Sequence, residues 1–290
     1  MGWAETFIAV DWGTTNRRAW RVEAGGVADE FEDGRGVLSV DKAEFPAAVV
    51  EIRARLGEHP MLMAGMIGSN RGWIEAPYVP CPAGLDDVAG SLAWAESGRT
   101  AIIPGISNAD PPDVMRGEEV QILGAVESSL IPTDCLVCHP GTHNKWAVVE
   151  GGKLTRFRTV MTGEMFSLLR EHSILSDMLR DEMAIDAAFC DGVRRGLEGG
   201  VLTAELFSVR AGVLLGMRRR EDATDYTSGL LIGADVGANL ADGTGDVFVM
   251  GRPELTALYA AAIDVAGREV REIDGEAAFL AGIKAIAGRL

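Results

Sequence analysis

An acidic residue and a turn of small polar residues stand near the start of the chain, directly after a short apolar run. The run 7–10 (FIAV) is too short for a helix and is typical of a buried central strand, which places Asp11 at a strand end. The turn that follows consists of Gly13, Thr14, Thr15 and Asn16. Glycine lets the backbone approach a ligand closely, and short polar side chains beside it suit anionic oxygens. Because a carboxylate repels phosphate, we expect Asp11 to hold Mg²⁺, which takes carboxylate, water and phosphate oxygens together.

Taken alone, these residues also fit an ordinary β-hairpin with a polar turn, because short motifs often match by chance. A degenerate copy of the turn decides between the two interpretations. It comprises Gly141, Thr142, His143 and Asn144, at an offset of 128 residues (141 minus 13). Trp146 echoes Trp20, and the glycine pair 151–152 echoes the pair 25–26. Each copy predicts strand, Gly-Thr turn, strand, glycine hairpin and strand, and a repeat of this length indicates a duplicated architecture.

Two further segments carry residues that could do chemistry. A loop rich in glycine follows the predicted strand 61–64, and its polar and aromatic members are Ser69, Asn70 and Trp73. Such a loop after a central strand is typical of ligand binding, although Trp73 also fits ordinary loop packing. The second segment is Arg116, Gly117, Glu118 and Glu119 at the start of the predicted helix 120–130. Its two carboxylates could complement the helix dipole, or one could be a catalytic base at a cleft.

Composition limits the classes of partner. The chain has 290 residues, a formal net charge of −16 and a pI near 4.7, so a nucleic-acid backbone would be repelled. The N-terminus lacks the features of a signal peptide and no apolar run approaches the ~20 residues of a membrane span, which predicts a cytoplasmic protein without a membrane partner. Cys135 and Cys138 have a zinc-like spacing, but the apolar residues between them favour a buried strand, and no second cysteine pair completes a tetrahedral site.

The remaining pattern predicts an α/β protein in two halves. Beyond those named, strands are expected at 17–22, 27–31, 100–103, 246–250 and, at a sheet edge, 269–273, with helices at 43–56, 164–219, 228–240, 255–266 and 277–287. Residues 84–97 are interpreted as an irregular helix and 106–115 as a long polar loop. The boundary between the halves is placed near 132–134. Two similar halves with a Gly-Thr turn each suggest one ligand with several phosphates.

The whole chain resembles the 2-dehydro-3-deoxygalactonokinase family. The stretches that carry the resemblance are AVDWGTTNRRAW, MAGMIGSNRGW, MRGEEVQILGA, PGTHNKW, FRTVMTGE, SGLLIGA and GREV, which span residues 9–271 in this order. The resemblance implies a duplicated actin-like, sugar-kinase architecture. Its two ribonuclease-H-like domains, 1–132 and 133–290, would flank a central nucleotide cleft. The first domain would carry the first phosphate loop and the sugar-acid site, and the second domain the second phosphate loop and the adenosine site.

The implied activity is transfer of the γ-phosphoryl group of ATP, with Mg²⁺, to the 6-hydroxyl of 2-dehydro-3-deoxy-D-galactonate in galactonate catabolism. By analogy with the fold, turn 13–16 is the first phosphate loop, and Gly141, Thr142 and His143 are the second. His139 stands where this superfamily often has an aspartate, which leaves the metal to Asp11, with a remote carboxylate as a further candidate. Glu118 is our first choice for the base that deprotonates the sugar hydroxyl, with Glu119 and Asp11 as alternatives.

The resemblance also implies sites for the rest of the two substrates. The carboxylate of a sugar acid needs a guanidinium fork or a group of N–H donors, for which Arg116 is the first candidate. Arg18 is the second, although strand alternation can instead point it at a structural carboxylate. Ser69, Asn70 and Trp73 would read hydroxyls or stack on the sugar. The adenosine would rest at Gly251, against helical residues near 228–233.

Three alternatives stay open at this point. The acceptor could be the gluconate epimer or another sugar. A nucleotide switch or assembly ATPase of the actin type would instead hydrolyse ATP slowly without an acceptor. The sequence does not indicate the oligomeric state, and a homodimer is compatible with it.

Overall fold

The computed structural model describes residues 3, 5–243 and 245–290. The chain divides into two units, each with its own set of internal contacts. The first unit comprises Met1–Thr133, Glu150–Arg156 and Gly275–Leu290, and the second comprises Asp134–Val149 and Phe157–Asp274. The predicted assignment of residues 275–290 to the second half therefore differs from the structure, in which they pack within the first unit.

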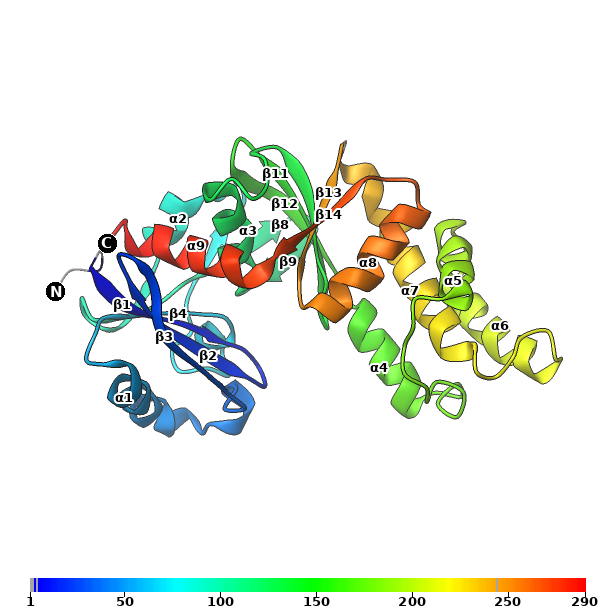
Figure 1. Cartoon of the computed structure of the whole chain (residues 1–290), viewed down its shortest axis with the longest axis horizontal. Coiled ribbons are helices and arrows are strands. Elements are labelled where there is room, and N and C mark those ends of the chain that lie inside the picture. The colour runs from blue at the N-terminus through cyan, green and yellow to red at the C-terminus, as the bar shows by residue number, and fades with distance from the viewer. Residues whose placement is uncertain (1–2, 4, 244) are drawn as a thin grey trace. The chain divides into compact units, whose positions relative to one another are not determined.

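The first unit is built on a six-stranded sheet with the order β3-β2-β1-β4-β7-β6 (Figure 1). Its strands are β1 (Thr6–Trp12), β2 (Arg17–Glu23), β3 (Gly26–Asp33), β4 (Met61–Ala64), β6 (Ala93–Glu96) and β7 (Thr100–Ile102). Strands β1, β4 and β7 are parallel, whereas the β1–β2–β3 and β6–β7 pairs are antiparallel. The three opening strands predicted from alternation and the Gly25–Gly26 turn are confirmed.

Helices cover both faces of this sheet. Helix α1 (Phe45–Leu56) packs Phe45 and Ile52 into the core cluster that also holds Ile8 and Val10 of β1. The opposite face of β2 carries Trp20, whose ring lies 5.4 Å from the ring of Phe279 in α9 (Gly275–Ala287). This alternation of neighbouring strand residues between two helical layers explains why the central strands are apolar throughout.

Helix α9 crosses α3 (Glu118–Glu127) at close range. A Cβ atom added at Gly124 would lie 2.1 Å from the carbonyl oxygen of Ala278, and one added at Gly282 would lie 2.1 Å from that of Val120. Glycine at both positions therefore lets the two backbones touch. This crossing is the physical reason why the last helix belongs to the first unit.

Two sequence predictions in the first unit are wrong. Residues 84–97 do not form an irregular helix, because only α2 (Leu85–Ala89) is helical and β6 follows it. Residues 106–115 are not a loop but the hairpin of β8 (Gly105–Ala109) and β9 (Pro112–Met115), which forms a three-stranded sheet with β5 (Tyr78–Pro80). In both segments the backbone pairs with a neighbouring strand, and this pairing outweighs the weak structural preference of the side chains.

The second unit is built on a five-stranded sheet with the order β12-β11-β10-β13-β14. Its strands are β10 (Cys135–His139), β11 (Asn144–Glu150), β12 (Lys153–Val160), β13 (Val247–Gly251) and β14 (Val270–Asp274). The order β12-β11-β10-β13 repeats the order β3-β2-β1-β4 of the first unit. In the same way β4 is parallel to β1, and β13 is parallel to β10. The internal repeat read from the sequence is thus a repeat of topology.

The helices of the second unit pack mainly around α7 (Ala223–Asn239). The others are α4 (Thr162–His172), α5 (Ala187–Leu197), α6 (Leu202–Leu214) and α8 (Pro253–Val265). A 3-10 turn at Leu240–Asp242 follows α7, and the first unit has others, at Val37–Ser39, Lys42–Glu44 and Met66–Gly68. Side chains of α5, α7 and α8 share a core with β10, β11 and β13. Proline lies in the first turn of α8, where its missing N–H costs no helical hydrogen bond.

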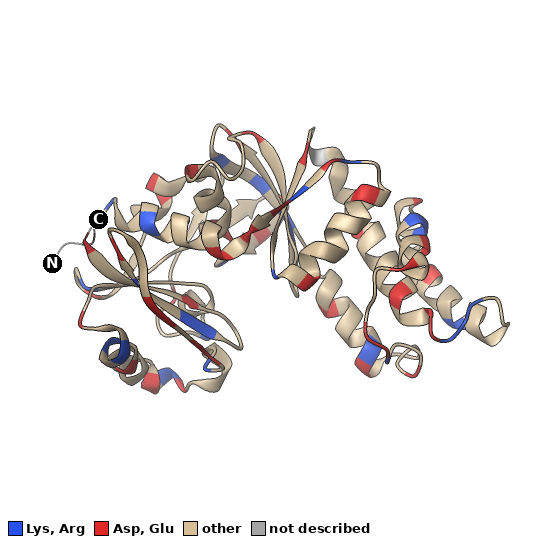
Figure 2. Cartoon of the chain, in the orientation of Figure 1, with Lys and Arg blue, Asp and Glu red and all other residues tan. Residues whose placement is uncertain are grey.

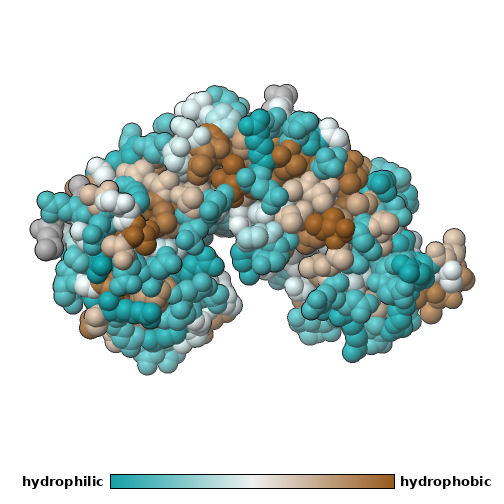
Figure 3. Space-filling model, in the orientation of Figure 1, coloured by the Kyte–Doolittle hydropathy of each residue, from teal (hydrophilic) through white to brown (hydrophobic). Residues whose placement is uncertain are grey.

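The surface of the described residues is mostly polar and rich in acids, which lie for example along β3 (Figure 2). An exception is the end of α6 and the residues after it, where exposed apolar side chains gather (Figure 3). They are Phe207, Leu214, Leu215 and Met217. No helix among the described residues is long and apolar enough to cross a membrane.

Candidate active site

The turn after β1 is held from behind by the segment that follows β3. Its carbonyl oxygens at Gly13, Thr14 and Thr15 accept hydrogen bonds from the backbone N–H groups of residues 36–38, at 2.9–3.2 Å. A Cβ atom added at Gly36 would lie 2.3 Å from the carbonyl carbon of Thr15, so this close backing requires glycine. The side chains of Thr14, Thr15 and Asn16 are exposed. The carbonyls of the turn are therefore directed into the protein and its hydroxyls toward solvent.

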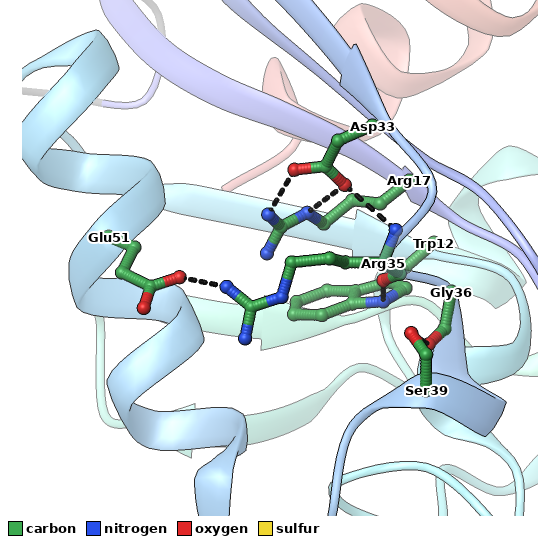
Figure 4. Close-up of polar contacts among 7 residues, drawn as sticks. All are labelled: Trp12, Arg17, Asp33, Arg35, Gly36, Ser39 and Glu51. Carbon is green, nitrogen blue, oxygen red and sulfur yellow. Dashed lines mark hydrogen bonds and ion pairs between the residues drawn. The ribbon is translucent and has the colours of Figure 1, made fainter.

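Figure 4 shows the contacts that hold the segment following β3, which lies behind the turn. Asp33 at the end of β3 accepts two hydrogen bonds from the guanidinium of buried Arg17, at 3.2 and 2.5 Å, and one from the backbone N–H of Arg35 at 3.1 Å. The indole Nε1 of Trp12 donates to the carbonyl oxygen of Arg35 at 2.8 Å. These contacts join both ends of the turn to the segment behind it and stabilise one conformation of the loop.

Asp11 lies where β1, β4 and the start of α3 meet. In the parallel pairing of β1 with β4 it stands opposite Ala64, and Gly65 comes next. A Cβ atom added at Gly65 would lie 3.3 Å from Oδ1 of Asp11, and one added at Gly117 would lie 3.2 Å from the Cα of Gly65. Both glycines have positive φ, +89° and +109°. Two predicted candidates, Asp11 and Glu118, thus lie close enough to interact electrostatically, where Gly65 after β4 meets Gly117 before α3.

The carboxyl of Asp11 is perturbed by its surroundings. Burial raises its pKa to about 6 against the opposing charge of Arg18, and the carboxylates of Glu118 and Glu32 add to the rise. No group of three or more His, Cys, Asp and Glu suited to a metal ion occurs among the described residues. One or two carboxylates nevertheless suit Mg²⁺, which in nucleotide sites takes most of its ligands from phosphate and water. Asp11 beside Glu118 fits such an ion.

The two glutamates at the start of α3 differ sharply. Glu119 is fully buried, and burial followed by the negative charge of Glu118 raises its pKa to about 8. Its Oε2 accepts from the N–H of Gly117 at 2.7 Å, and its Oε1 has no hydrogen-bond partner. Glu118 is partly exposed, and its Oε2 accepts from the N–H of Arg116 at 3.0 Å. Both therefore bind the backbone just before the helix, but only Glu118 is also accessible to a ligand.

The guanidinium of Arg116 is turned into the protein. Its Nη2 donates to the carbonyl oxygen of Ala76 at 2.8 Å, and its Cζ lies 4.3 Å from the centre of the Tyr78 ring. Its Nε and Nη1 are buried and have no hydrogen-bond partner. A Cβ atom added at Gly68 would lie 2.7 Å from Nη1, so the side chain passes directly under the loop that follows β4.

The other predicted sugar-acid residues lie on that loop or on β2. Ser69 is buried and its Oγ accepts from the N–H of Arg71 at 3.2 Å, while Asn70 is exposed. Trp73 packs against the core of the first unit, as the packing interpretation expects. Arg18 pairs with Glu32 at 3.2 Å and with Glu276 at 3.6 Å. It points at structural carboxylates, which was the second of the two orientations considered for it.

The second Gly-Thr turn is backed by α4. The carbonyl oxygen of Thr142 accepts from the N–H of Glu164 at 2.9 Å, and Nε2 of His143 lies 2.6 Å from Oε2 of Glu164. A Cβ atom added at Gly163 would lie 2.6 Å from the carbonyl oxygen of Gly141. Thr142 and His143 are exposed. The second turn thus resembles the first in having its carbonyl side covered and its side chains exposed, but His143 is paired with Glu164.

Gly251 ends β13 beside this turn. Its φ is +151°, and a Cβ atom there would lie 3.2 Å from the carbonyl oxygen of Pro140. The helical residues near 228–233 do not lie open to an adenosine, because Gly229 and Gly233 contact the backbone of α5 at Phe189 and Val193. The small residues of α7 serve helix packing, and the adenosine site near them stays a prediction.

Sequence reasoning missed one buried group near the second turn, Asp235 in the middle of α7. It is 4% exposed and accepts hydrogen bonds from five side chains, among them Asn144 directly after the turn. A single acid in the apolar stretch GLLIGADVGAN was the only available signal, since a buried carboxylate must be hydrogen-bonded or paired. Four of the five donors lie 24 to 91 residues away from Asp235 in the sequence, so no local motif could show them.

Duplicated units, each with a Gly-Thr turn after its first strand, define an actin-like ATPase fold of the sugar-kinase type. The ADPNP-bound activator of 2-hydroxyisocaproyl-CoA dehydratase from Clostridium difficile has this fold at a TM-score of 0.52, over 98% of this chain and 95% of that chain, with 11% identity. The chain belongs to the 2-keto-3-deoxy-galactonokinase family, which it matches over residues 11–286. It is a phosphotransferase of an ATP-dependent kinase family.

Two relatives support this assignment over the whole length. The chain is 38% identical to the 2-dehydro-3-deoxygalactonokinase of Escherichia coli (strain K12) over 288 residues, which are 97% of each protein. A crystal structure from Sinorhizobium meliloti, named for the same enzyme, superposes with a TM-score of 0.92 at 37% identity and covers 98% of each chain. The predicted family and fold class are confirmed.

Proposed function

We propose that the protein transfers the γ-phosphoryl group of ATP to the 6-hydroxyl of 2-dehydro-3-deoxy-D-galactonate, a step of galactonate catabolism. The observation that carries the proposal is the full-length relation to the Escherichia coli enzyme of that name. The geometry of the first unit agrees with it, because Asp11 and Glu118 meet beside a Gly-Thr turn whose hydroxyls are exposed.

The two Gly-Thr turns are assigned to the phosphates of ATP. Residues Gly13, Thr14, Thr15 and Asn16 supply the first turn, and Gly141, Thr142 and His143 the second. The carbonyl oxygens of Gly13, Thr14 and Thr15 in the first turn accept hydrogen bonds from behind, as does that of Thr142 in the second, which leaves the opposite side of the backbone to face an anion. Gly251 is kept as the adenosine residue, because its position beside Pro140 adjoins the second turn.

Asp11 is assigned to Mg²⁺, directly or through water. The ion, when bound, neutralises charge on the phosphates during phosphoryl transfer. A cation there also fits the carboxylates of Asp11 and Glu118, whose mutual repulsion contributes to the raised pKa of Asp11. The chain itself has to supply the orientation of the acceptor hydroxyl and a place for its proton.

Glu118 is assigned as the base. It takes the proton of the 6-hydroxyl while the oxygen forms its bond to the γ-phosphorus and the bond from that phosphorus to the β-bridging oxygen breaks, releasing ADP. Glu119 suits this role less, because a carboxyl with a pKa of about 8 is mostly protonated at neutral pH. Asp11 stays the alternative, since its carboxyl is ionised above pH 6.

Arg116 is assigned to the carboxylate of the sugar acid. Two of its nitrogens are buried without a partner, which costs free energy that a bound carboxylate would recover. Reaching them requires the side chain to leave Ala76 and Tyr78, so we expect Arg116 to reorient when the acid binds. Ser69 and Asn70 keep their assignment to the sugar hydroxyls, with Arg18 and Trp73 as weaker candidates.

The activity is tested by incubating the protein with ATP, Mg²⁺ and a panel of 2-oxo-3-deoxy sugar acids. We expect ADP release only in the presence of a cognate acid, and a phosphorus-31 spectrum in which the product phosphate couples to the C6 protons. ATP hydrolysis that is independent of any acid would instead indicate a nucleotide switch. A cytoplasmic location and a homodimer stay predictions, and light scattering after gel filtration checks the second.

A further inference from the structure

A buried carboxylate in the second unit is surrounded by hydrogen-bond donors. Asp235 lies in α7 and is 4% exposed. The side chains that donate to it are Asn144 at 3.0 Å, Trp146 at 2.8 Å, Thr162 at 2.7 Å, Tyr259 at 2.7 Å and Asn239 at 3.1 Å. All five are neutral, so Asp235 is held by hydrogen bonds alone. A buried charge is tolerated only with such complete satisfaction, which makes the arrangement specific.

Two of the donors belong to the segments that enclose the second Gly-Thr turn. Asn144 follows His143 directly, and Thr162 precedes Gly163, whose backbone contacts the carbonyl of Gly141. Thr162 is also the first residue of α4, the helix that covers the carbonyl side of the turn. The single carboxylate of Asp235 therefore connects Asn144, at the end of the turn, to Thr162, at the start of the helix that covers the turn.

Of the other three donors, Trp146 lies two residues beyond Asn144 on β11, whereas Tyr259 and Asn239 come from helices. Tyr259 lies in α8, and its hydroxyl donates to Oδ2 at 2.7 Å, the same atom and distance as for Thr162. Asn239 is one helical turn along α7 from Asp235 itself. Thr162 and Tyr259 thus form a matched pair of hydrogen bonds, one on the side of the turn and one on the side of the helical core.

We propose that Asp235 is a positioning residue for nucleotide binding: through Asn144 and Thr162 it fixes the turn 141–143 in the conformation that receives phosphate. This inference rests on the proposed function, in which that turn binds ATP. Asp235 itself is buried and touches no ligand. Its effect should appear in the affinity for ATP and not in the KM for the acid.

The test compares Thr162→Val with Tyr259→Phe, each of which removes one hydrogen bond to Oδ2 of Asp235 with little change of shape. Both variants should lower the melting temperature. Only Thr162→Val should weaken binding of Mg²⁺-ATP, by about tenfold in a calorimetric titration, the size expected for a lost hydrogen bond to a charged group. Thr162→Ser, which keeps the hydroxyl, should bind ATP like the wild type.

Equal effects of Thr162→Val and Tyr259→Phe on the Kd for ATP would overturn the inference, since Asp235 would then be only structural. The same holds if Thr162→Ser fails to restore binding. Should Thr162→Val not fold, Asn144→Ala replaces it in the same comparison. Wild-type protein that binds ATP but phosphorylates no acid would refute the proposed function and leave this inference intact, because its readout is binding.

Discussion

The proposed metal ligand Asp11 and the proposed base Glu118 lie near each other, beside Gly65 and Gly117. Gly65 and Gly117 are required for this, because both have positive φ and a side chain on either would displace its neighbours. The sequence placed Asp11 and Glu118 in one site only through a resemblance. Their proximity depends on backbone geometry at two glycines, which no spacing of the two acids, 107 residues apart (118 minus 11), could show.

Replacing Glu118 with glutamine tests the base directly. Glutamine cannot accept the proton, so kcat should fall by roughly 100-fold or more, while the Kd for ATP stays nearly unchanged. Steady-state kinetics and a binding titration measure the two quantities. Glu44→Gln is the matched control, because Glu44 also stands at the start of a helix in the first unit and makes no capping hydrogen bond. A normal kcat in Glu118→Gln would move the role to Asp11 or Glu119.

Replacing Asp11 with asparagine tests the metal site. Asparagine keeps the shape but weakens binding of a hard cation, so the Mg²⁺ concentration needed for half-maximal activity should rise. A titration of activity against Mg²⁺ shows whether high metal restores the rate. Asp41→Asn, at an exposed acid of the same unit, should behave like the wild type. An unchanged metal requirement in Asp11→Asn would contradict the assignment.

The buried carboxyl of Glu119 predicts a pH dependence of stability. Its pKa is raised from the model-peptide value of 4.5 to about 8, so the folded protein keeps a proton that the unfolded chain loses. The free energy of unfolding should therefore fall as pH rises from about 4.5 to 8. Glu119→Gln removes this slope and should be more stable than the wild type at pH 9, by at least ~1 kcal/mol, the equivalent of one pKa unit.

Urea unfolding at pH 5 and pH 9 measures this difference. Glu127→Gln serves as control, because Glu127 is exposed at the other end of the same helix and its replacement should leave the slope unchanged. If Glu119→Gln is no more stable than the wild type at pH 9, Glu119 does not carry the proposed buried proton.

At the scale of elements, the sequence predicted those strands and helices whose side chains alternate between two environments. The opening hairpins, α1, β13 and α8 are confirmed because most of their apolar residues face a core. Strand β6 and the β8–β9 hairpin were missed, because they are short, pair through backbone hydrogen bonds and show no clear alternation of apolar and polar side chains. The role of α9 in the first unit was missed because contact between α3 and α9 depends on two distant glycines.

The α3–α9 crossing predicts a cost for any side chain at Gly124. In Gly124→Ala the added methyl group would meet the carbonyl oxygen of Ala278 at 2.1 Å, so the helices must separate. The expected loss of stability is roughly 1–3 kcal/mol, the range for overpacking a core. Gly25→Ala is the control, since nothing lies within 4 Å of its added Cβ. Urea unfolding compares the two, and equal stabilities would show that the crossing is not tight.

At the scale of the whole molecule, the repeat of strand order is what the sequence revealed best. The Gly-Thr turns, tryptophans and glycine pairs recur at nearly constant offsets, and the structure shows the same four-strand order in both units. The substrate site could not be read with the same certainty. Arg116, Arg18 and Trp73 were chosen by residue type, and the structure turns each of them toward the protein. Packing, and not residue type, decides whether a side chain points into the protein or toward a ligand.

The central claim is that this phosphotransferase acts on the galactonate-derived acid. The most direct measurement is kcat/KM for 2-dehydro-3-deoxy-D-galactonate and for its gluconate epimer, with ADP release followed under identical Mg²⁺-ATP. The proposed function predicts a clear preference for the galactonate-derived acid, of at least about tenfold, as expected when a site's polar groups are matched to one hydroxyl orientation. An equal or higher kcat/KM for the gluconate epimer, or turnover with neither acid, would contradict it.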